Sequence, residues 1–272
     1  MSATHLKLHT APEVPLEAEV VNPTVFANLS QSGIENLNVM HGNVKCHLGD
    51  FFKVTGKGAS EIHVEGDLSS VKLIGAGMTE GKITVDGDVG MHLGVGMSGG
   101  EIVINGNAGD WVGPEMTGGR ITIKKNAGHM VGSAYRGQST GIMGGEIFVH
   151  GNAKNEIGSA MRRGLIVVGG NAGDFTGVNM LAGTIIVLGE LGIRTGAGMK
   201  RGTIVSLHDA PMLPSFEYSC TYHPLFLRLY YSRLRANGFK RKIQDQHLSG
   251  KYKRYSGDGI ELNRGEVLLF AR

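Results

Sequence analysis

The chain has 272 residues, of which 41% are hydrophobic, and a formal net charge of +3. This length allows one large domain or two small ones, and so weak a net charge gives no support for nucleic-acid binding. Two cysteines exclude a disulfide framework. No apolar run approaches the roughly 18 residues of a membrane span, and the start shows no apolar signal region. We therefore expect a cytoplasmic protein with neither nucleic acid nor membrane as a partner.

Glycine is the outlier of the composition, with 44 residues against only 7 prolines. The low proline content excludes a collagen-like or Pro/Gly-rich disordered chain. Glycine at this level favours many turns that need positive φ or a close backbone approach.

Residues 1–55 show no repeat, whereas residues 56–207 repeat themselves. One short apolar strand pattern recurs eight times, with successive Ile spacings of 21, 19, 19, 26, 19, 19 and 19. The predicted strands are 60–64, 81–85, 100–104, 119–123, 145–149, 164–168, 183–187 and 202–206. A unit this short cannot bury its apolar side alone, so the units must stack. We predict an all-β fold: a right-handed parallel β-helix of about eight coils, because the six-residue repeat of a left-handed form is absent.

The segment GVGMSG at Gly94–Gly99 matches G-x-G-x-x-G, the fingerprint of a dinucleotide-binding loop. That fingerprint needs a strand before it and a long helix after it. Here the match belongs to the 19-residue repeat, which leaves no room for a helix. The pattern therefore indicates a recurring turn and not a phosphate site.

Stacked repeats turn equivalent residues into columns. The residue before each strand Ile alternates in charge and predicts a stabilising outward ladder: Glu61, Lys82, Glu101, Arg120 and Glu146. The polar residue after each strand predicts side chains that cap backbone groups at one bend: Asp67, Asp88, Asn107, Asn126, Asn152, Asn171 and Glu190.

The middle strand position also points outward and becomes apolar in the last four repeats. It holds Phe148, Val167, Ile186 and Val205. Soluble monomers rarely expose such a contiguous stripe. Either the C-terminal tail folds back over it, or another chain docks there.

The spacing of 26 contains an insertion around SAYRGQSTG (133–141). An insertion in a repeat protein becomes a projecting loop, which is often functional. Tyr135 and Arg136 are its candidate binding residues, and a plain solvated loop is the alternative.

Two basic pairs lie 38 residues apart, in MRRG (161–164) and MKRG (199–202). Two repeat lengths place Arg162 and Arg163 about 10 Å from Lys200 and Arg201 on the same face. Such cations suit an extended polyanion, because Arg binds carboxylates through two parallel hydrogen bonds. An ordinary solvated basic patch is the alternative.

Residues 208–272 form a tail outside the repeat, and both flanks are predicted caps for the open strand ends. Residues 224–238 predict a helix that begins at Pro224 and ends at Gly238. From 228 to 254 the tail carries nine Lys or Arg and one acid, which favours an acidic partner surface. Phe226 and Tyr230 are the candidate docking side chains of the tail.

No catalytic residues are predicted. The 11 histidines form no H-E-x-x-H, and neither cysteine has metal-ligand spacing with them. G-x-S-x-G occurs around Ser98 and Ser139, but neither site has room for the helix of a nucleophile elbow.

The whole chain resembles the C subunit of formylmethanofuran dehydrogenase and its relatives, whose GXGXG repeat is shared with the glutamate synthase large subunit. VGSAYRGQSTGIMGGEI (131–147) and GNAKNEIG (151–158) are the most specific pieces, with PLEAEVVNPTVFA (15–27) and MHGNVKCHLGDFF (40–52). The tail segments 218–239 and 251–258 look like the bacterial branch, the formyltransferase/hydrolase complex of formaldehyde oxidation.

The resemblance implies a non-catalytic structural subunit with no cofactor or metal of its own. Its partners would be a zinc amidohydrolase-like subunit, a formyltransferase subunit and a molybdopterin-protein-like subunit. The partners would hold the zinc and handle tetrahydromethanopterin and a methanofuran-like coenzyme. That coenzyme carries a polyglutamate-like tail, for which the candidate contacts are the cofactor-binding residues predicted above: Tyr135, Arg136, Arg162, Arg163, Lys200 and Arg201.

Two alternatives stay open. The chain could be the C subunit of a tungsten or molybdenum formylmethanofuran dehydrogenase, whose metal and iron–sulfur clusters lie on other chains. A different class is a stand-alone carbohydrate-active β-helix enzyme, which needs a groove of acids and bases on adjacent coils.

Overall fold

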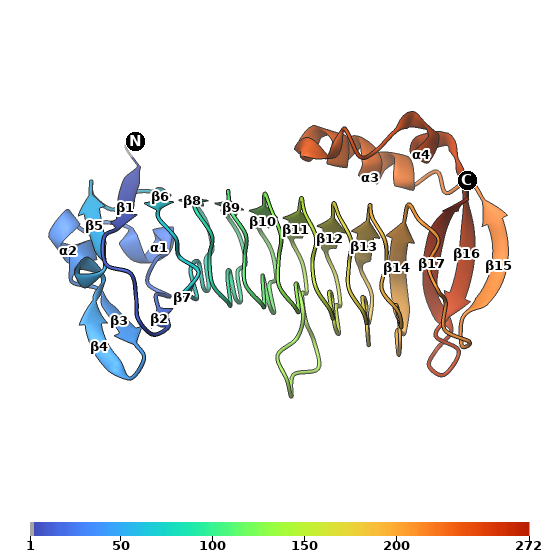
Figure 1. Cartoon of the computed structure of the whole chain (residues 1–272), viewed down its shortest axis with the longest axis horizontal. Coiled ribbons are helices and arrows are strands. Elements are labelled where there is room, and N and C mark those ends of the chain that lie inside the picture. The colour runs from blue at the N-terminus through green and yellow to red at the C-terminus, as the bar shows by residue number, and fades with distance from the viewer. Residues whose placement is uncertain (1–2, 272) are drawn as a thin grey trace.

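The computed structural model describes residues 3–271 and is built mainly of β-strands, as predicted. Within this range, thirteen strands form one long sheet and four form a smaller one. Figure 1 shows an elongated stack of turns, with helices near both ends. No helix in the described range is long and apolar enough to cross a membrane.

Each predicted repeat strand is a strand in the structure. The eight are β6 (Glu61–Glu65), β8 (Lys82–Asp86), β9 (Glu101–Ile104), β10 (Arg120–Ile123), β11 (Glu146–Val149), β12 (Leu165–Val168), β13 (Thr184–Val187) and β14 (Arg201–Ser206). Neighbours pair in parallel and in register, so that Ile83 lies beside Ile102 and Ile102 beside Ile121. A second series of parallel bridges joins Leu68, Val89, Ala108, Ala127, Ala153, Ala172 and Leu191. The chain therefore returns to the sheet one strand further along after each repeat.

The stacking brings the predicted columns together. The charge column is in register from Glu61 to Glu146, and it includes ion pairs of 3.3 Å between Lys82 and Glu101 and 3.1 Å between Arg120 and Glu146. In the amide column, the Asn126 side chain accepts from the Asn152 backbone N–H at 2.9 Å. The Asn152 side chain accepts in turn from Asn171 at 2.8 Å. These side chains satisfy backbone donors at an exposed bend.

The N-terminal segment adds two strands to the long sheet. β1 (Thr4–Leu8) pairs in parallel with β6, and β5 (Phe52–Thr55) pairs antiparallel with β1. The small sheet runs β4 (Val44–His47), β3 (Asn38–His41), β2 (Leu16–Glu17) and β7 (Val71–Lys72). Short helices complete this end: α1 (Pro23–Phe26), α2 (Gln31–Glu35) and η1 (Leu48–Asp50).

The C-terminal tail ends the long sheet in the same manner. β17 (Arg264–Ala271) pairs in parallel with β14, and β16 (Lys251–Gly257) and β15 (Glu217–Tyr222) follow antiparallel. Between β15 and β16 the chain forms α3 (Leu227–Leu234), the π-type turn η2 (Arg235–Phe239) and α4 (Asp245–Ser249). The division into segments 1–55, 56–207 and 208–272 stays a prediction.

The helix predicted from Pro224 begins at Leu227 instead. The first turn is tighter, because Leu227, Arg228 and Leu229 each donate to the carbonyl three residues earlier. The helix also ends earlier than predicted: α3 stops at Leu234, and Gly238 lies within η2 with φ of +90°, a conformation that costs glycine little.

Gly94 and Gly96 of GVGMSG share a backbone conformation but differ in the space around them. Gly94 has φ of +63°, and a Cβ there would lie 2.6 Å from Ile121 Cδ1 of the core. Gly96 has the same backbone conformation, φ +64°, but nothing lies within 4 Å of its Cβ position. Substitutions at these two glycines therefore separate the cost of the left-handed backbone conformation from the cost of a steric clash.

We predict that Gly94→Ala destabilises the chain more than Gly96→Ala. Gly96→Ala incurs the left-handed backbone cost of about 1–2 kcal/mol, and Gly94→Ala adds an overpacking cost of about 1–3 kcal/mol. Urea unfolding of the two variants and the parent measures the difference. Equal losses of unfolding free energy would show that the close approach to Ile121 has no energetic consequence.

Candidate basic site

The four predicted basic residues line one hollow of about 460 Å³. We call it the basic hollow; its lining is Arg162, Arg163, Leu181, Ala182, Gly183, Lys200, Arg201 and Leu262. Each basic pair follows a fully buried methionine, Met161 or Met199, which fixes the turn to the core. The next residues are exposed, and the chain then enters β12 or β14. The repeat thus places two pairs of cations two strands apart on one side of the stack.

A second hollow of about 490 Å³ adjoins the first and shares Arg163 and Gly183 with it. Its wall includes Tyr230 and Arg233 from α3 and Glu146 from β11. Tyr230 was predicted as a docking residue, and the structure places it beside the cations. Sequence reasoning missed Arg233, although it stands three residues after Tyr230 and so shares its side of a helix.

The charge of this surface is predominantly positive. Glu146 is the only carboxylate among the described lining residues of the two hollows, and it pairs with Arg120 at 3.1 Å and Arg233 at 2.7 Å. Lys200 has a weak contact of 3.8 Å with Glu261. No ion pair within residues 3–271 involves Arg162, Arg163 or Arg201. Three guanidinium groups are therefore available for an anion.

Tyr135 and Arg136 do not line the basic hollow. They belong to the insertion, which Figure 1 shows as the green loop that leaves the stack. The Tyr135 hydroxyl is 2.7 Å from His92 Nδ1, and its ring also faces Trp111, whose ring stacks on His92. Burial raises the pKa of Tyr135 to about 12. Arg136 is exposed beside this aromatic group.

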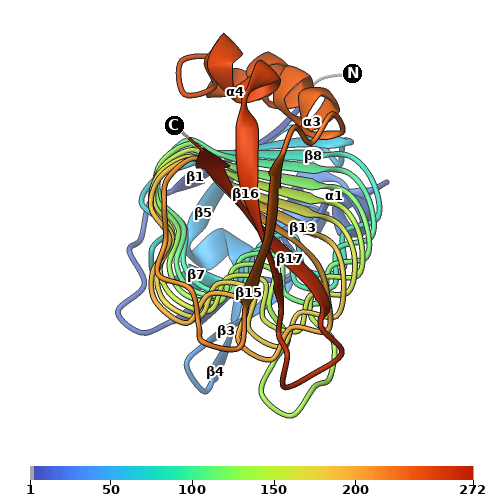
Figure 2. The same cartoon turned by 90° about the vertical axis from the view of Figure 1, so that its right-hand side faces the viewer.

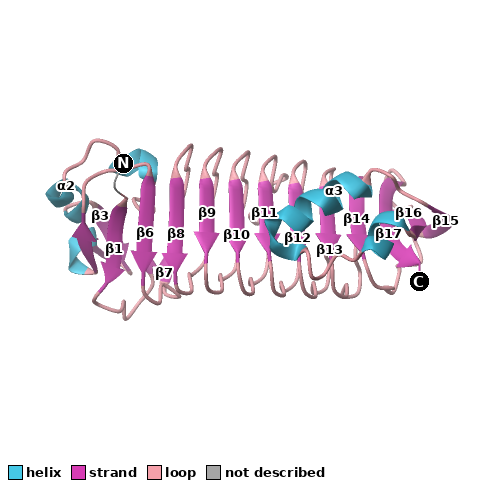
Figure 3. Cartoon of the chain, turned by 90° about the horizontal axis from the view of Figure 1, so that it is seen from above, coloured by secondary structure: helices cyan, strands magenta, loops and turns pink. Residues whose placement is uncertain are grey.

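The apolar stripe is covered by the tail, the first of the two arrangements that the sequence left open. Phe148, Val167, Ile186 and Val205 are at most 1% exposed. They pack in a second core with tail residues Leu227, Tyr231, Leu234, Phe239, Ile243, Tyr252, Leu268 and Phe270. Figures 2 and 3 show α3 lying over this side of the stack. These four side chains are therefore not available to a partner while the tail is in place.

Polar contacts fasten the tail at the strand ends. The Lys242 ammonium donates to the carbonyls of His150 at 2.9 Å and Gly169 at 2.7 Å. The His150 ring stacks on Phe239 with centroids 4.3 Å apart. Burial, with the neighbouring charges of Lys124 and Lys242, lowers the pKa of His150 to about 4. His150 is thus neutral in the folded chain near pH 7.

Apolar side chains are also exposed on α3 and just before it. Leu229 is 77% exposed, Leu225 63% and Phe226 38%. The Phe226 and Tyr230 rings meet edge to face at 6.3 Å. We call Leu225, Phe226, Leu229 and Tyr230 the outer ridge; it is an exposed apolar surface of the kind that binds partners.

The chain is similar to known proteins in sequence and in structure. A family model described as GXGXG motif matches residues 101–217. The C subunit of the tungsten-containing formylmethanofuran dehydrogenase 2 of Methanothermobacter thermautotrophicus is 45% identical over 97 residues, 34% of this chain and 36% of the relative. The C subunit of the molybdenum-containing formylmethanofuran dehydrogenase 1 of Methanosarcina barkeri is 44% identical over 87 residues, 30% and 29%. The matched stretch thus spans about a third of these curated relatives.

A solved structure matches nearly the whole chain. A chain in the formyltransferase/hydrolase complex of Methylorubrum extorquens, in complex with methylofuran, superimposes with a TM-score of 0.91. The sequence identity is 34%, and the match covers 98% of this chain and 100% of that chain.

We predict that the anchoring of the tail weakens in acid because of His150. The unfolded chain has the ordinary histidine pKa near 6.5, whereas the folded value is about 4. Stability is therefore fully present above about pH 6.5 and is lost as pH falls toward 4. Urea midpoints between pH 7 and pH 4.5 measure the slope, which His150→Phe reduces. His223→Phe, at an exposed histidine of the same tail, is the control; equal slopes in both variants would contradict the assignment.

Proposed function

The chain belongs to the family of formylmethanofuran dehydrogenase C subunits, and we propose that it is the non-catalytic structural subunit of a formyltransferase/hydrolase complex. The observation that carries this proposal is the match to a chain of such a complex over 98% of this chain, with a TM-score of 0.91. The complex would transfer formyl between tetrahydromethanopterin and a methanofuran-like coenzyme and release formate.

The proposal includes the form of the scaffold, a right-handed parallel β-helix of about eight coils. Its support is the in-register parallel pairing of β6 to β14, with a second series of parallel bridges along another side. A stack of this kind presents equivalent residues at regular heights. It can therefore hold several partners along its length without an active site of its own.

The partners would be a zinc amidohydrolase-like subunit, a formyltransferase subunit and a molybdopterin-protein-like subunit. We propose the outer ridge of α3 as a docking surface for one of them, because its apolar side chains are exposed beside Arg228 and Arg233. An apolar patch with a cationic rim fits a partner surface with apolar anchors and acidic neighbours.

The basic hollow would bind the polyglutamate-like tail of the coenzyme. An extended chain of carboxylates needs cations spread over a length, and the two adjoining hollows offer Arg163 between Lys200 on one side and Arg233 on the other. Guanidinium groups bind carboxylates with two parallel hydrogen bonds. Tyr135 and Arg136 remain candidates for a separate contact farther along the coenzyme tail.

A second candidate function is that of the C subunit of a tungsten or molybdenum formylmethanofuran dehydrogenase. The 45% identity to the tungsten-containing relative favours it, although that match covers a third of the chain. In that case the metal and iron–sulfur clusters would lie on partner chains.

Purification of the native complex through this chain, with mass spectrometry and a metal assay, distinguishes the two candidates. We expect zinc with amidohydrolase-like and formyltransferase subunits. Tungsten or molybdenum with iron–sulfur subunits would identify the dehydrogenase, and a free monomer with no partners would overturn both.

We predict that Arg162→Gln/Arg163→Gln weakens the binding of poly-L-glutamate to the complex by about tenfold or more, because two charge-assisted contacts are lost. The matched control is Lys124→Gln/Lys125→Gln, which removes the same charge from an exposed bend. Fluorescence anisotropy of labelled poly-L-glutamate measures both. An equal loss in both variants would reduce the effect to net charge and remove the hollow as the site.

We predict that Leu229→Asp releases a partner subunit from the complex while the chain stays folded, because Leu229 makes the most exposed part of the outer ridge. Val44→Asp, at an exposed apolar residue in the distant β3–β4 hairpin, is the control. Native mass spectrometry measures composition, and circular dichroism checks the fold. A complete complex with Leu229→Asp would exclude docking through the ridge.

A further inference from the structure

A hollow of about 660 Å³ lies where α4 faces the carboxyl ends of β13, β14 and β17. We call it the tail pocket. Its volume falls in the range of small-molecule sites, about 300–1,000 Å³. It shares no lining residue with the basic hollow, so a ligand bound here would be independent of the proposed function.

The floor of the tail pocket is apolar. Leu188, Leu207 and Phe270 line it, and each is 4–7% exposed. They belong to the second core, between the stack and the tail. The pocket can therefore accept an apolar group of the size of one ring or a branched alkyl chain.

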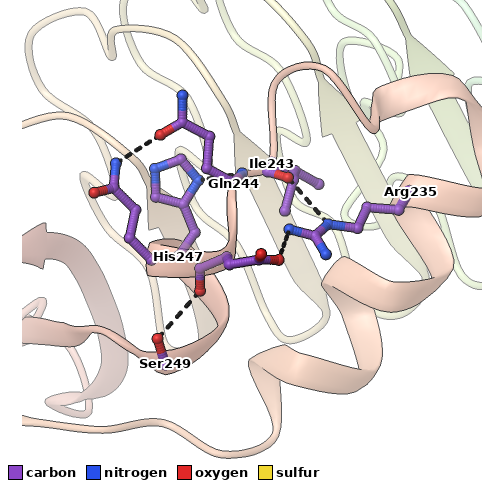
Figure 4. Close-up of polar contacts among 7 residues, drawn as sticks. Arg235, Ile243, Gln244, His247 and Ser249 are labelled. Atoms are coloured by element: carbon purple, nitrogen blue, oxygen red, sulfur yellow. Dashed lines mark hydrogen bonds and ion pairs between the residues drawn. The ribbon is translucent and has the colours of Figure 1, made fainter.

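The rim of the pocket is rich in hydrogen-bond donors. His247 Nδ1 accepts from the Gln244 backbone N–H at 3.1 Å, which assigns the ring proton to Nε2. Burial, with the neighbouring charges of Arg235 and His208, lowers the pKa of His247, so that the ring is a neutral donor near pH 7. Figure 4 shows the Gln244 and His247 side chains close together on this turn.

Lys242 supplies a positive charge to the same rim. An ammonium group has three N–H groups. Two of those on Lys242 donate to strand-end carbonyls, which leaves one for a ligand. Because its described hydrogen bonds go to carbonyls and not to carboxylates, they do not neutralise its positive charge.

The one acid of this segment is directed elsewhere. Asp245 is bound by Arg235 at 2.8 Å, and its side chain is 94% exposed; Figure 4 shows Arg235 approaching the turn from the side of Ile243. No carboxylate is among the described residues that line the pocket. An exposed cation, Lys242, thus lies at the rim of the pocket together with neutral donors and above an apolar floor.

We infer that the tail pocket binds a small organic monoanion, a carboxylate attached to a ring or branched alkyl group. The carboxylate would lie at the rim, where Lys242 provides charge and His247 and the glutamine amides provide donors. The apolar body would lie on Leu188, Leu207 and Phe270. A ligand there would contact both the stack and the tail, and so would favour the docked tail.

The test is ligand-observed ¹⁹F NMR of the full chain with 4-fluorobenzoate, and with 4-fluorobenzamide as the uncharged probe of the same shape. We expect saturable binding of the benzoate and at least about tenfold weaker binding of the benzamide, because the contact to the cation is lost. Lys242→Gln should weaken benzoate binding by a similar factor. Lys240→Gln, an exposed tail lysine outside the pocket, should leave it unchanged.

Ser249→Trp is a second variant, which fills the mouth of the pocket without touching the Lys242 contacts. It should abolish benzoate binding, and it keeps the inference testable if the Lys242→Gln variant fails to fold. The inference is overturned if the parent shows no saturable binding, if both probes bind equally, or if Ser249→Trp binds like the parent. These outcomes do not depend on whether the basic hollow binds poly-L-glutamate. The inference and the proposed function can therefore fail separately.

Discussion

The structure depends on the register between repeats. Ile lies beside Ile from β8 to β10, and the amide of each bend accepts from the backbone N–H of the next one. These contacts form only if every repeat has the same length or loops out its excess, as the insertion at 133–141 does. A shift of one residue would reverse the inward and outward faces of a strand. The inward columns are therefore fixed, whereas outward positions can vary except where a bend amide or the packed tail constrains them.

A stack held in this way has two ends, and each is extended by the same arrangement of strands. At the start, β1 continues the parallel pairing and β5 turns it antiparallel. At the other end, β17 continues it and β16 and β15 follow antiparallel. The C-terminal tail also covers the outer side of β11 to β14, because these strands carry apolar residues outward. Covering them turns part of the stack's surface into a second core.

The repeat made much of this arrangement predictable from the sequence. Equivalent residues at a spacing of 19 locate the eight strands, the charge column and the amide column, because each repeat reports the same local structure. The two basic pairs were predictable for the same reason, since 38 residues are two repeats. The non-repeating parts were not. Nothing in the spacing indicates that Arg233 reaches Glu146 or that Leu262 lines the basic hollow, because these contacts join segments that no periodicity relates.

The sequence also placed Arg136 in the same group as the basic pairs, because it stands in the insertion and carries a positive charge. The insertion instead turns toward His92 and Trp111, because the Tyr135 ring finds an aromatic surface and a hydrogen-bond partner there. Local composition identified an unusual loop but not the direction in which it folds. That direction is set by side chains one and two repeats away, Trp111 and His92.

The tail connects the two surfaces on which the proposed function depends. Among the described residues, Glu146 is the one carboxylate that lines the adjoining hollow, and Arg233 of α3 pairs with it. A partly exposed ion pair of this kind contributes little to stability, about 0–1 kcal/mol. Its effect on charge is larger, because Arg233 is the second cation on Glu146 after Arg120, and the two guanidinium groups together outweigh the acid that would repel a chain of carboxylates beside Arg163. The helix that exposes an apolar ridge to a partner is thus also the helix that completes the cationic surface. Under the proposed function, Arg233 of the docked tail would therefore contribute positive charge to the surface that binds the polyanion.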